Sequence, residues 1–293
     1  MSAAQAGQYL RQAAAQPLQT VSISGGEPCL YLDVVAEVAR EARSLGVLAV
    51  WLFTNAFWAT SRAATVARLA RLKQAGVTRL CLSADGFHQP FVPTARVKRA
   101  LVEGRDLGFE LLVDVRFLGS PEADNPVNRM TRQVVAQLGD LSQVELWQGL
   151  PRCIGRAAES LAAQLGQRAR FPGGPCPGPW AGGTWEEPAG VDVDPYGEVT
   201  LCPGLSVGNA RDRPLNTLLA GYSPWRHPII RQLAGGGPAA LAEMARSVGY
   251  APRAGYVDEC HLCYDVRRFL RPQYPSELAP PICYQEAPAR AVR

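Results

Sequence analysis

A short segment with two adjacent glycines and a glutamate stands out among the residues that can do chemistry. Gly25, Gly26, Glu27 and Pro28 follow a short apolar run and precede a helical pattern. Paired glycines let the backbone approach a ligand closely, because they have no Cβ and tolerate positive φ. The Glu27 carboxylate can hold an ammonium group there by a charge-assisted hydrogen bond. The segment therefore predicts a ligand-binding turn at the end of a strand.

Cysteines in the second half of the chain form the other chemically informative set. Cys260 and Cys263 have the Cys-x2-Cys spacing, which lets two thiolates bind one metal from a single turn. Cys176 and Cys202 lie upstream, and Cys283 is a spare that could replace Cys176. Four thiolates suit both a structural zinc ion and an iron–sulfur cluster, so the spacing leaves both open.

Composition and charge limit the classes to which this protein can belong. The chain has 293 residues, of which 47% are hydrophobic and 19% charged, as is usual for a soluble globular protein. Its net charge is +4 and its basic residues form no run, which argues against nucleic-acid binding. No apolar stretch approaches the ~18 residues of a membrane span, and the N-terminus lacks the pattern of a secretory signal. We expect a cytoplasmic protein with reduced cysteines and no membrane partner.

Strand and helix patterns alternate through the first half of the chain. Such alternation implies right-handed βα units and a parallel sheet. Because the chain opens on a helical pattern and polar residues follow successive strands, we predict a partial barrel that lacks its first strand. In parallel barrels the carboxyl ends of the strands carry the site. The expected strands are 19–24, 47–53, 78–83, 110–117 and 143–147, and the expected helices between them are 31–45, 62–74, 94–107 and 128–138.

The composition changes after residue 156. Residues 172–183 are dense in glycine and proline, which is typical of a linker or an irregular loop. Residues 191–201 predict a β-hairpin, and 238–247 predict a helix. We expect the basic segment 267–271 on a solvated helix face. The fold prediction is therefore α/β, with a barrel domain over 1–157 and a small, irregular, cysteine-rich domain over 158–293.

The motifs at the strand ends resemble, in their order, those of the radical S-adenosylmethionine (radical SAM) enzymes. That family has a partial, TIM-like (β/α)6 barrel with a Gly-Gly-Glu-Pro turn after its second strand, matched here by residues 25–28. A Thr-Asn turn follows its third strand, and a Ser-x-Asp segment follows its fourth. Thr54-Asn55 and Ser83-Ala84-Asp85 match these turns. Several motifs in register over residues 19–157 are far more specific than any one alone.

The resemblance implies a function and a set of cofactor-binding residues. A radical SAM enzyme reductively cleaves S-adenosylmethionine (SAM) to a 5′-deoxyadenosyl radical, which abstracts a hydrogen from the substrate. The implied substrate class is a peptide or protein to be modified, and the implied electron donor is a reductase or a ferredoxin. The Glu27 turn would contact the methionine ammonium, the segment ending at His88 would approach the ribose, and Arg116 would pair with the carboxylate. The implied cofactor-binding residues are Gly25, Gly26, Glu27, Pro28, Thr54, Asn55, Ser83, Asp85, His88 and Arg116.

The second half resembles the auxiliary-cluster domains, of the SPASM and shorter twitch types, that follow many radical SAM barrels. Those domains use a hairpin ending in Gly-x4-Cys, matched here by Gly197 and Cys202. The resemblance implies one auxiliary 4Fe–4S cluster that relays electrons or anchors the substrate. Its implied ligands are Cys176, Cys202, Cys260 and Cys263.

The chain departs from the family at one point. Radical SAM barrels hold the SAM-binding 4Fe–4S cluster with a Cys-x3-Cys-x2-Cys loop, and this sequence contains no such triplet. The missing loop coincides with the missing first strand. We therefore expect that the N-terminal part of the barrel is lacking, that this chain by itself is inactive, and that its catalytic residues are unknown. The alternative is a non-catalytic barrel with a four-cysteine zinc or cluster site that binds a peptide or protein partner.

Overall fold

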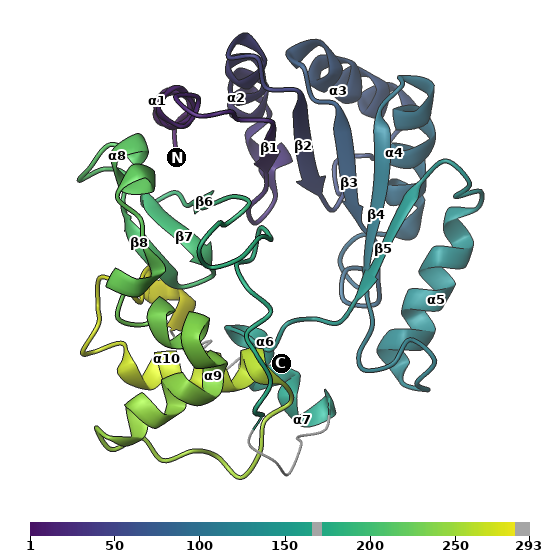
Figure 1. Cartoon of the computed structure of the whole chain (residues 1–293). Helices are drawn as coiled ribbons and strands as arrows, with labels where there is room; N and C mark the ends of the chain where they lie inside the picture. Colours follow the sequence, from purple (N-terminus) through teal and green to yellow (C-terminus); the bar gives the residue numbers. More distant parts are fainter. Residues whose placement is uncertain (166–171, 285–293) are drawn as a thin grey trace. The chain divides into compact units, whose positions relative to one another are not determined.

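The computed structural model describes residues 1–165 and 172–284 (Figure 1). Its contacts divide the chain into two compact units, Ser2–Pro151 and Arg152–Arg293. The sequence places the domain boundary at residue 157, a few residues beyond this division. Within the described part of the chain, no helix is both long enough and apolar enough to cross a membrane.

A five-stranded sheet organises the unit Ser2–Pro151 (Figure 1). Each strand pairs in parallel with the next strand along the chain, which confirms the predicted parallel sheet. Parallel neighbours need a crossover connection, and here a helix lies in each one. The strands are β1 (Thr20–Ile23), β2 (Ala49–Thr54), β3 (Arg79–Ser83), β4 (Glu110–Arg116) and β5 (Glu145–Gly149).

The helices of this unit cover one face of the sheet (Figure 1). Alternate residues of a strand point to opposite faces, so Val50 and Leu52 of β2 enter the core while Trp51 faces away from it. Ser61 and Asn125 cap two of the helices by accepting a backbone N–H. The helices are α1 (Ala3–Ala13), which packs on α2 (Leu32–Ser44), followed by α3 (Arg62–Ala75), α4 (Thr94–Asp106) and α5 (Pro126–Leu138).

The opposite face of the sheet carries a cluster of aromatic and charged side chains. The Arg79 guanidinium lies 4.5 Å from the centre of the Trp51 ring, and it forms ion pairs with Glu110 and Glu145, each at 2.9 Å. The Trp51 ring lies 6.3 Å from the Trp147 ring, although β2 and β5 are three strand spacings apart, or about 14 Å in a flat sheet. This convergence is expected where a sheet is concave on that face.

The unit Arg152–Arg293 contains a second, antiparallel sheet (Figure 1). Strand β6 (Asp192–Val193) pairs with β7 (Glu198–Cys202), as the hairpin pattern predicts, and β7 pairs with β8 (Leu205–Asn209). Gly197 has φ of 91° in the connecting turn, and a Cβ there would lie 2.6 Å from the Asn209 side chain. Glycine is therefore required at this position.

Three longer helices complete this unit, α8 (Leu215–Ala220), α9 (Ile230–Arg246) and α10 (Glu259–Leu270). Helix α9 consists of two helical segments that are interrupted at Gly237, where φ is 68° and ψ is −164°. The second segment begins at Pro238, as the sequence predicts, whereas the first, from Ile230, was not predicted. Shorter helical segments in the chain are η1 (Pro28–Tyr31), α6 (Arg156–Ser160), α7 (Ala162–Leu165), η2 (Pro224–Arg226) and η3 (Pro281–Tyr284).

Candidate functional site

Parallel pairing places the ends of β1 to β5 along one edge of the sheet. Residues 25–28 follow β1, Thr54 and Asn55 close β2, residues 83–88 leave β3, and Arg116 ends β4. The structure therefore gathers the residues implied to bind SAM at a single edge. Gly25 and Gly26 are exposed, and a Cβ at either position would meet no atom within 4 Å, so the backbone is open to a ligand there.

The Glu27 carboxylate joins the turn after β1 to the end of β2. Its Oε1 accepts hydrogen bonds from the Cys29 N–H at 3.0 Å and from the Thr54 hydroxyl at 2.8 Å. Its Oε2 accepts from the Asn55 N–H at 2.9 Å. A carboxylate offers about four lone-pair positions, and the Cys29 side chain also forms a hydrogen bond with Glu27, so at most about one position is left for a ligand ammonium. Glu27 is half-buried, which keeps that position accessible.

The hydroxyl of Thr54 makes all of its hydrogen bonds within the protein. Its side chain is buried, and Oγ1 donates to Glu27 while accepting from Trp58 Nε1 at 2.9 Å and from the Ala56 N–H at 3.1 Å. The hydroxyl has one proton and two lone pairs, and these three bonds use them all. Thr54 therefore orients the Glu27 carboxylate, and its own hydroxyl has nothing left for a cofactor.

Thr54→Val is expected to destabilise the fold by about 2–4 kcal/mol, because it leaves the buried indole and amide donors without an acceptor. Thr60→Val is the matched control, since Thr60 is exposed and follows the same turn. Urea unfolding of the full chain, followed by tryptophan fluorescence, measures the difference. Equal stability of the two variants would contradict the assigned role of Thr54.

Asp85 has a similar positioning role at the next strand end. It is 1% exposed. Its Oδ1 accepts from the Phe87 and His88 N–H groups at 2.9 and 3.1 Å and lies 2.8 Å from His88 Nδ1. Its Oδ2 accepts from the Arg116 N–H at 3.1 Å. Asp85 thus ties the turn after β3 to the end of β4, which leaves Ser83 and His88, both half-buried, as the groups there that a ligand can reach.

The hydrogen bond to Asp85 raises the pKa of His88 above 6.5, although burial acts in the opposite direction. Burial instead lowers the pKa of His227 and of His261 below 6.5. These are the three histidines of the chain. Proton NMR titration should therefore show one histidine ring titrating above 6.5 and two below, and His88→Gln should remove the highest. Loss of one of the two lower titrations instead would contradict this order.

The raised pKa also makes stability depend on pH. The protonated His88 is favoured in the folded state, so its stabilising contribution is complete below the unfolded value of about 6.5 and disappears as pH rises through the folded pKa. The Tm advantage of the wild-type chain over His88→Gln should therefore be larger at pH 6 than at pH 8.5. An advantage that grows with pH would contradict the assignment.

Arg116 offers a partly free guanidinium at the end of β4. It forms an ion pair with Asp114 at 2.7 Å and lies over Gly149 of β5, where a Cβ would come within 2.5 Å of its Nη1. Guanidinium has five donors, so the ion pair leaves several for a ligand carboxylate. The glycine provides the space in which the guanidinium lies.

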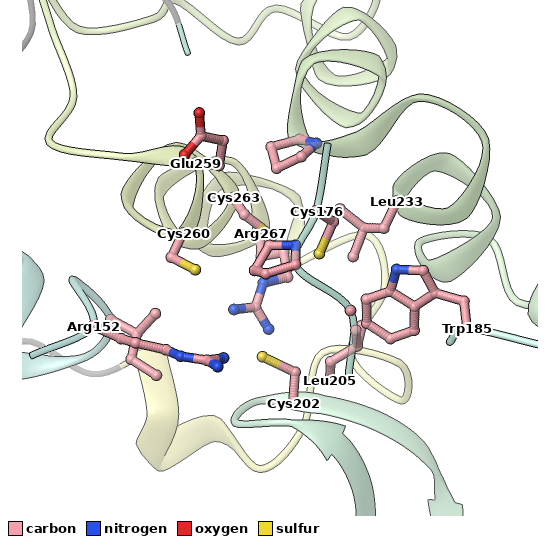
Figure 2. A pocket seen from close by; sticks show the side chains of 14 residues that line it. Arg152, Cys176, Trp185, Cys202, Leu205, Leu233, Glu259, Cys260, Cys263 and Arg267 are labelled. Atoms are coloured by element: carbon pink, nitrogen blue, oxygen red, sulfur yellow. The ribbon is translucent and has the colours of Figure 1, made fainter. Parts of the chain in front are cut away.

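The four candidate metal ligands line one cavity inside the unit Arg152–Arg293 (Figure 2). Cys176, Cys202, Cys260 and Cys263 come from a loop, the end of β7 and the first turns of α10. Among the described residues, Cys283 does not line this cavity, so Cys176 is the better fourth ligand. The cavity has a volume of about 20 Å³, which is room for about one water molecule.

Local structure explains how these thiols are presented. Asp258 caps α10 by accepting the His261 N–H at 2.7 Å, and Cys260 and Cys263 then share a helix face because they are three residues apart. The Cys176 segment packs against the kink of α9, where a Cβ at Gly237 would lie 3.2 Å from the Cys176 nitrogen. Glycine at the kink lets the two backbones approach.

Burial keeps three of these thiols protonated. It raises the pKa of Cys260 to about 12 and that of Cys263 to about 12, and it also raises the pKa of Cys176. Because a metal binds the thiolate, loading this site must release protons from these three side chains.

Arg267 lies at the centre of this group of thiols (Figure 2). It is 1% exposed, so the predicted solvated face over 267–271 is wrong at this position. Its Nη1 donates to the Pro203 carbonyl at 3.0 Å and to the Tyr284 hydroxyl at 3.3 Å, whereas Nε has no partner. No carboxylate of residues 1–165 and 172–284 forms an ion pair with it. A buried cation without an anion is costly, so the cavity favours an anionic group.

The thiols do not form a site for a single ion as they stand. No three described His, Cys, Asp or Glu side chains are placed to hold one metal ion. Zinc would need each sulfur within about 2.3 Å. In a 4Fe–4S cluster each thiolate binds a different iron, so the sulfurs stand farther apart. Four thiols are the donor type that such a cluster takes, and Arg267, which now lies among them, is the side chain that would have to withdraw for a cluster to bind.

Comparisons with known proteins add no assignment. No family model matches the chain, and the search of curated proteins finds no match either.

Proposed function

We propose that the chain is a radical SAM-type protein with a SPASM/twitch-like domain that holds one auxiliary 4Fe–4S cluster. The observation that carries this proposal is the cavity of the second unit. Four cysteines spread between positions 176 and 263 line it together with a buried arginine that has no ion-pair partner among the described residues. Four thiolates bound to iron would supply the negative charge that Arg267 lacks. A cytoplasmic location would keep the thiols reduced and free to bind iron.

The sheet edge supports the SAM-binding half of the proposal. Glu27 retains at most about one acceptor position for the methionine ammonium, Arg116 retains donors for the carboxylate, and Ser83 and His88 are accessible for the ribose. Thr54 and Asp85, which the family resemblance groups with these residues, act by holding them in place. The concave face with Trp51 and Arg79 supports a partial barrel.

Bound SAM and reduced iron–sulfur clusters would supply the radical chemistry, with an electron from a ferredoxin or reductase. The residues of this chain would orient the cofactor and shield it from water, and a peptide or protein is the proposed substrate class. Because the sequence has no Cys-x3-Cys-x2-Cys triplet, we do not expect these 293 residues alone to cleave SAM.

That missing triplet also favours one alternative, a non-catalytic barrel whose four-cysteine site serves a peptide-binding or partner-binding role. Both functions share the second unit, so they differ in SAM binding at the sheet edge. Isothermal calorimetry with SAM separates them: binding to wild type, at least tenfold weaker in Glu27→Gln, supports the first. Equal binding, or none, by the two proteins supports the second.

Anaerobic reconstitution with iron and sulfide tests the cluster. We expect about four irons and four sulfides per chain, as one 4Fe–4S cluster requires. We also expect no 5′-deoxyadenosine when SAM and dithionite are added. Zinc binding without iron would overturn the cluster assignment, and efficient SAM cleavage would falsify the conclusion drawn from the missing triplet.

A further inference from the structure

Arg267 belongs to the same helix face as two of the proposed ligands. Cys260, Cys263 and Arg267 follow one another at intervals of three and four residues along α10, so their side chains lie in one row. The guanidinium is within electrostatic range of Cys176, Cys202 and Cys263. Whatever rotamer the side chain adopts, its Cβ remains one turn beyond Cys263.

The other charged groups near α10 do not neutralise Arg267. Asp265 points to the opposite side of the helix, where it pairs with Arg253 at 2.7 Å. Glu259 lines the cavity, but no ion pair joins it to Arg267 in the described structure. At Cys260, Asp258 and Arg152 act with opposite signs. Arg267 is therefore the buried charge of this cavity that has no ion-pair partner among the described residues.

A structural role accounts for only part of Arg267. It donates to the Pro203 carbonyl and the Tyr284 hydroxyl, forms a hydrogen bond with the Cys263 side chain, and lies 5.8 Å from the centre of the Tyr284 ring. A neutral donor could make the hydrogen bonds without burying a charge, and a cation–π contact contributes about 2 kcal/mol, which is less than the cost of burying an unpaired charge. An anion beside the guanidinium is therefore still missing among the described residues.

We propose that Arg267, after its side chain has turned away from the centre of the cavity, stays beside the iron–sulfur group as its counter-charge and raises its reduction potential. This inference rests on the proposed function. Reduction transfers one electron from a ferredoxin-type donor, or from dithionite in vitro, to the bound cluster, and no bond is formed or broken. A guanidinium held nearby in a poorly solvated site stabilises the state with the additional negative charge.

Two substitutions separate charge from shape. Arg267→Gln keeps an N–H donor for Pro203 and Tyr284 and removes the charge, whereas Arg267→Lys keeps the charge on a long side chain. Arg268→Gln is the control, because Arg268 is the next residue of the helix, does not line the cavity and pairs with Glu159 at 2.8 Å. All four proteins, wild type included, are reconstituted anaerobically as full-length chains with iron and sulfide.

The main measurement is the reduction potential, from an EPR-monitored titration with dithionite. For Arg267→Gln we expect the equilibrium constant for reduction to fall at least tenfold, which is about 59 mV for a one-electron couple. Arg267→Lys and Arg268→Gln should stay near the wild-type potential. A second measurement is the rise in Tm on loading, which should be smaller for Arg267→Gln than for wild type, whatever the substitution does to the metal-free chain.

The outcomes distinguish this inference from the function on which it rests. A wild-type chain that takes up no cluster would overturn the proposed function and this inference with it. Loaded wild type and Arg267→Gln with equal potentials and equal gains in Tm would overturn this inference alone. If Arg267→Gln cannot be isolated folded, the Arg267→Lys potential decides: a value close to wild type supports the charge role, and a drop as large as tenfold contradicts it.

Discussion

Serine at position 176, 202, 260 or 263 is expected to reduce iron retention roughly 100-fold or more. Four-ligand metal sites in small domains bind with about 10–16 kcal/mol, so one ligand in four accounts for roughly 3–4 kcal/mol. The hydroxyl is a far poorer ligand for iron than a thiolate. The effect should appear at each position, because all four side chains line the same cavity. Iron and sulfide content after gel filtration, with the absorbance near 400 nm, gives the readout.

Cys283→Ser is the matched control for this series. Cys283 is half-buried and lies near the cavity without lining it, so its replacement should leave iron content unchanged. The sequence leaves Cys176 and Cys283 as competing fourth ligands. If Cys283→Ser lost iron and Cys176→Ser retained it, the assignment of the fourth ligand would be reversed.

Asp265→Ala is expected to destabilise the chain by about 2–4 kcal/mol, because it removes a buried carboxylate to which buried hydroxyl groups donate. Asp265 is buried, and its Oδ1 pairs with Arg253 at 2.7 Å. Its Oδ2 accepts from the Tyr250 hydroxyl at 2.7 Å and from the Tyr256 hydroxyl at 3.2 Å. Removing the carboxylate leaves these groups without their shared acceptor in a region of low dielectric.

Glu243→Ala provides the comparison for Asp265→Ala. Glu243 also pairs with an arginine, Arg246, but its side chain is 65% exposed. Exposed pairs contribute about 0–1 kcal/mol, so this variant should unfold close to wild type. Urea unfolding of the metal-free full chain measures both. A loss below about 1 kcal/mol for Asp265→Ala would contradict the stabilising role of this carboxylate.

The parallel sheet could be predicted because its determinants are local. β2 is an uninterrupted apolar run between two amphipathic helices, and that rhythm allows few arrangements other than a parallel sheet. The same rhythm puts the strand ends at one edge, so the sequence also predicts that Glu27 and Arg116 share an edge. What it does not reveal is which polar groups are already used. In the sequence, Thr54 and Asp85 are candidate cofactor-binding residues in the same way as Glu27. In the structure, their hydrogen bonds are all made within the fold.

Helix α9 shows what the sequence did not reveal before Pro238. The predicted helix from 238 is present, but another helical segment from Ile230 precedes it and ends at Gly237, where φ is 68° and ψ is −164°. Leu233 of the first segment and Leu241 of the second both join the core. That packing outweighs the roughly 1 kcal/mol that a glycine costs in a helix.

The sequence by itself determined which chemical groups are present and how they are spaced: the cysteines and the glycine-rich turn with its carboxylate. It also determined the alternation of strands and helices that builds a parallel sheet. These follow from residue type and short-range periodicity. Only the tertiary structure decided that thiols up to 87 residues apart line one cavity, and that Arg267 is enclosed with them rather than solvated. Burial and charge compensation depend on segments distant in the chain, and no local pattern records which of them will meet.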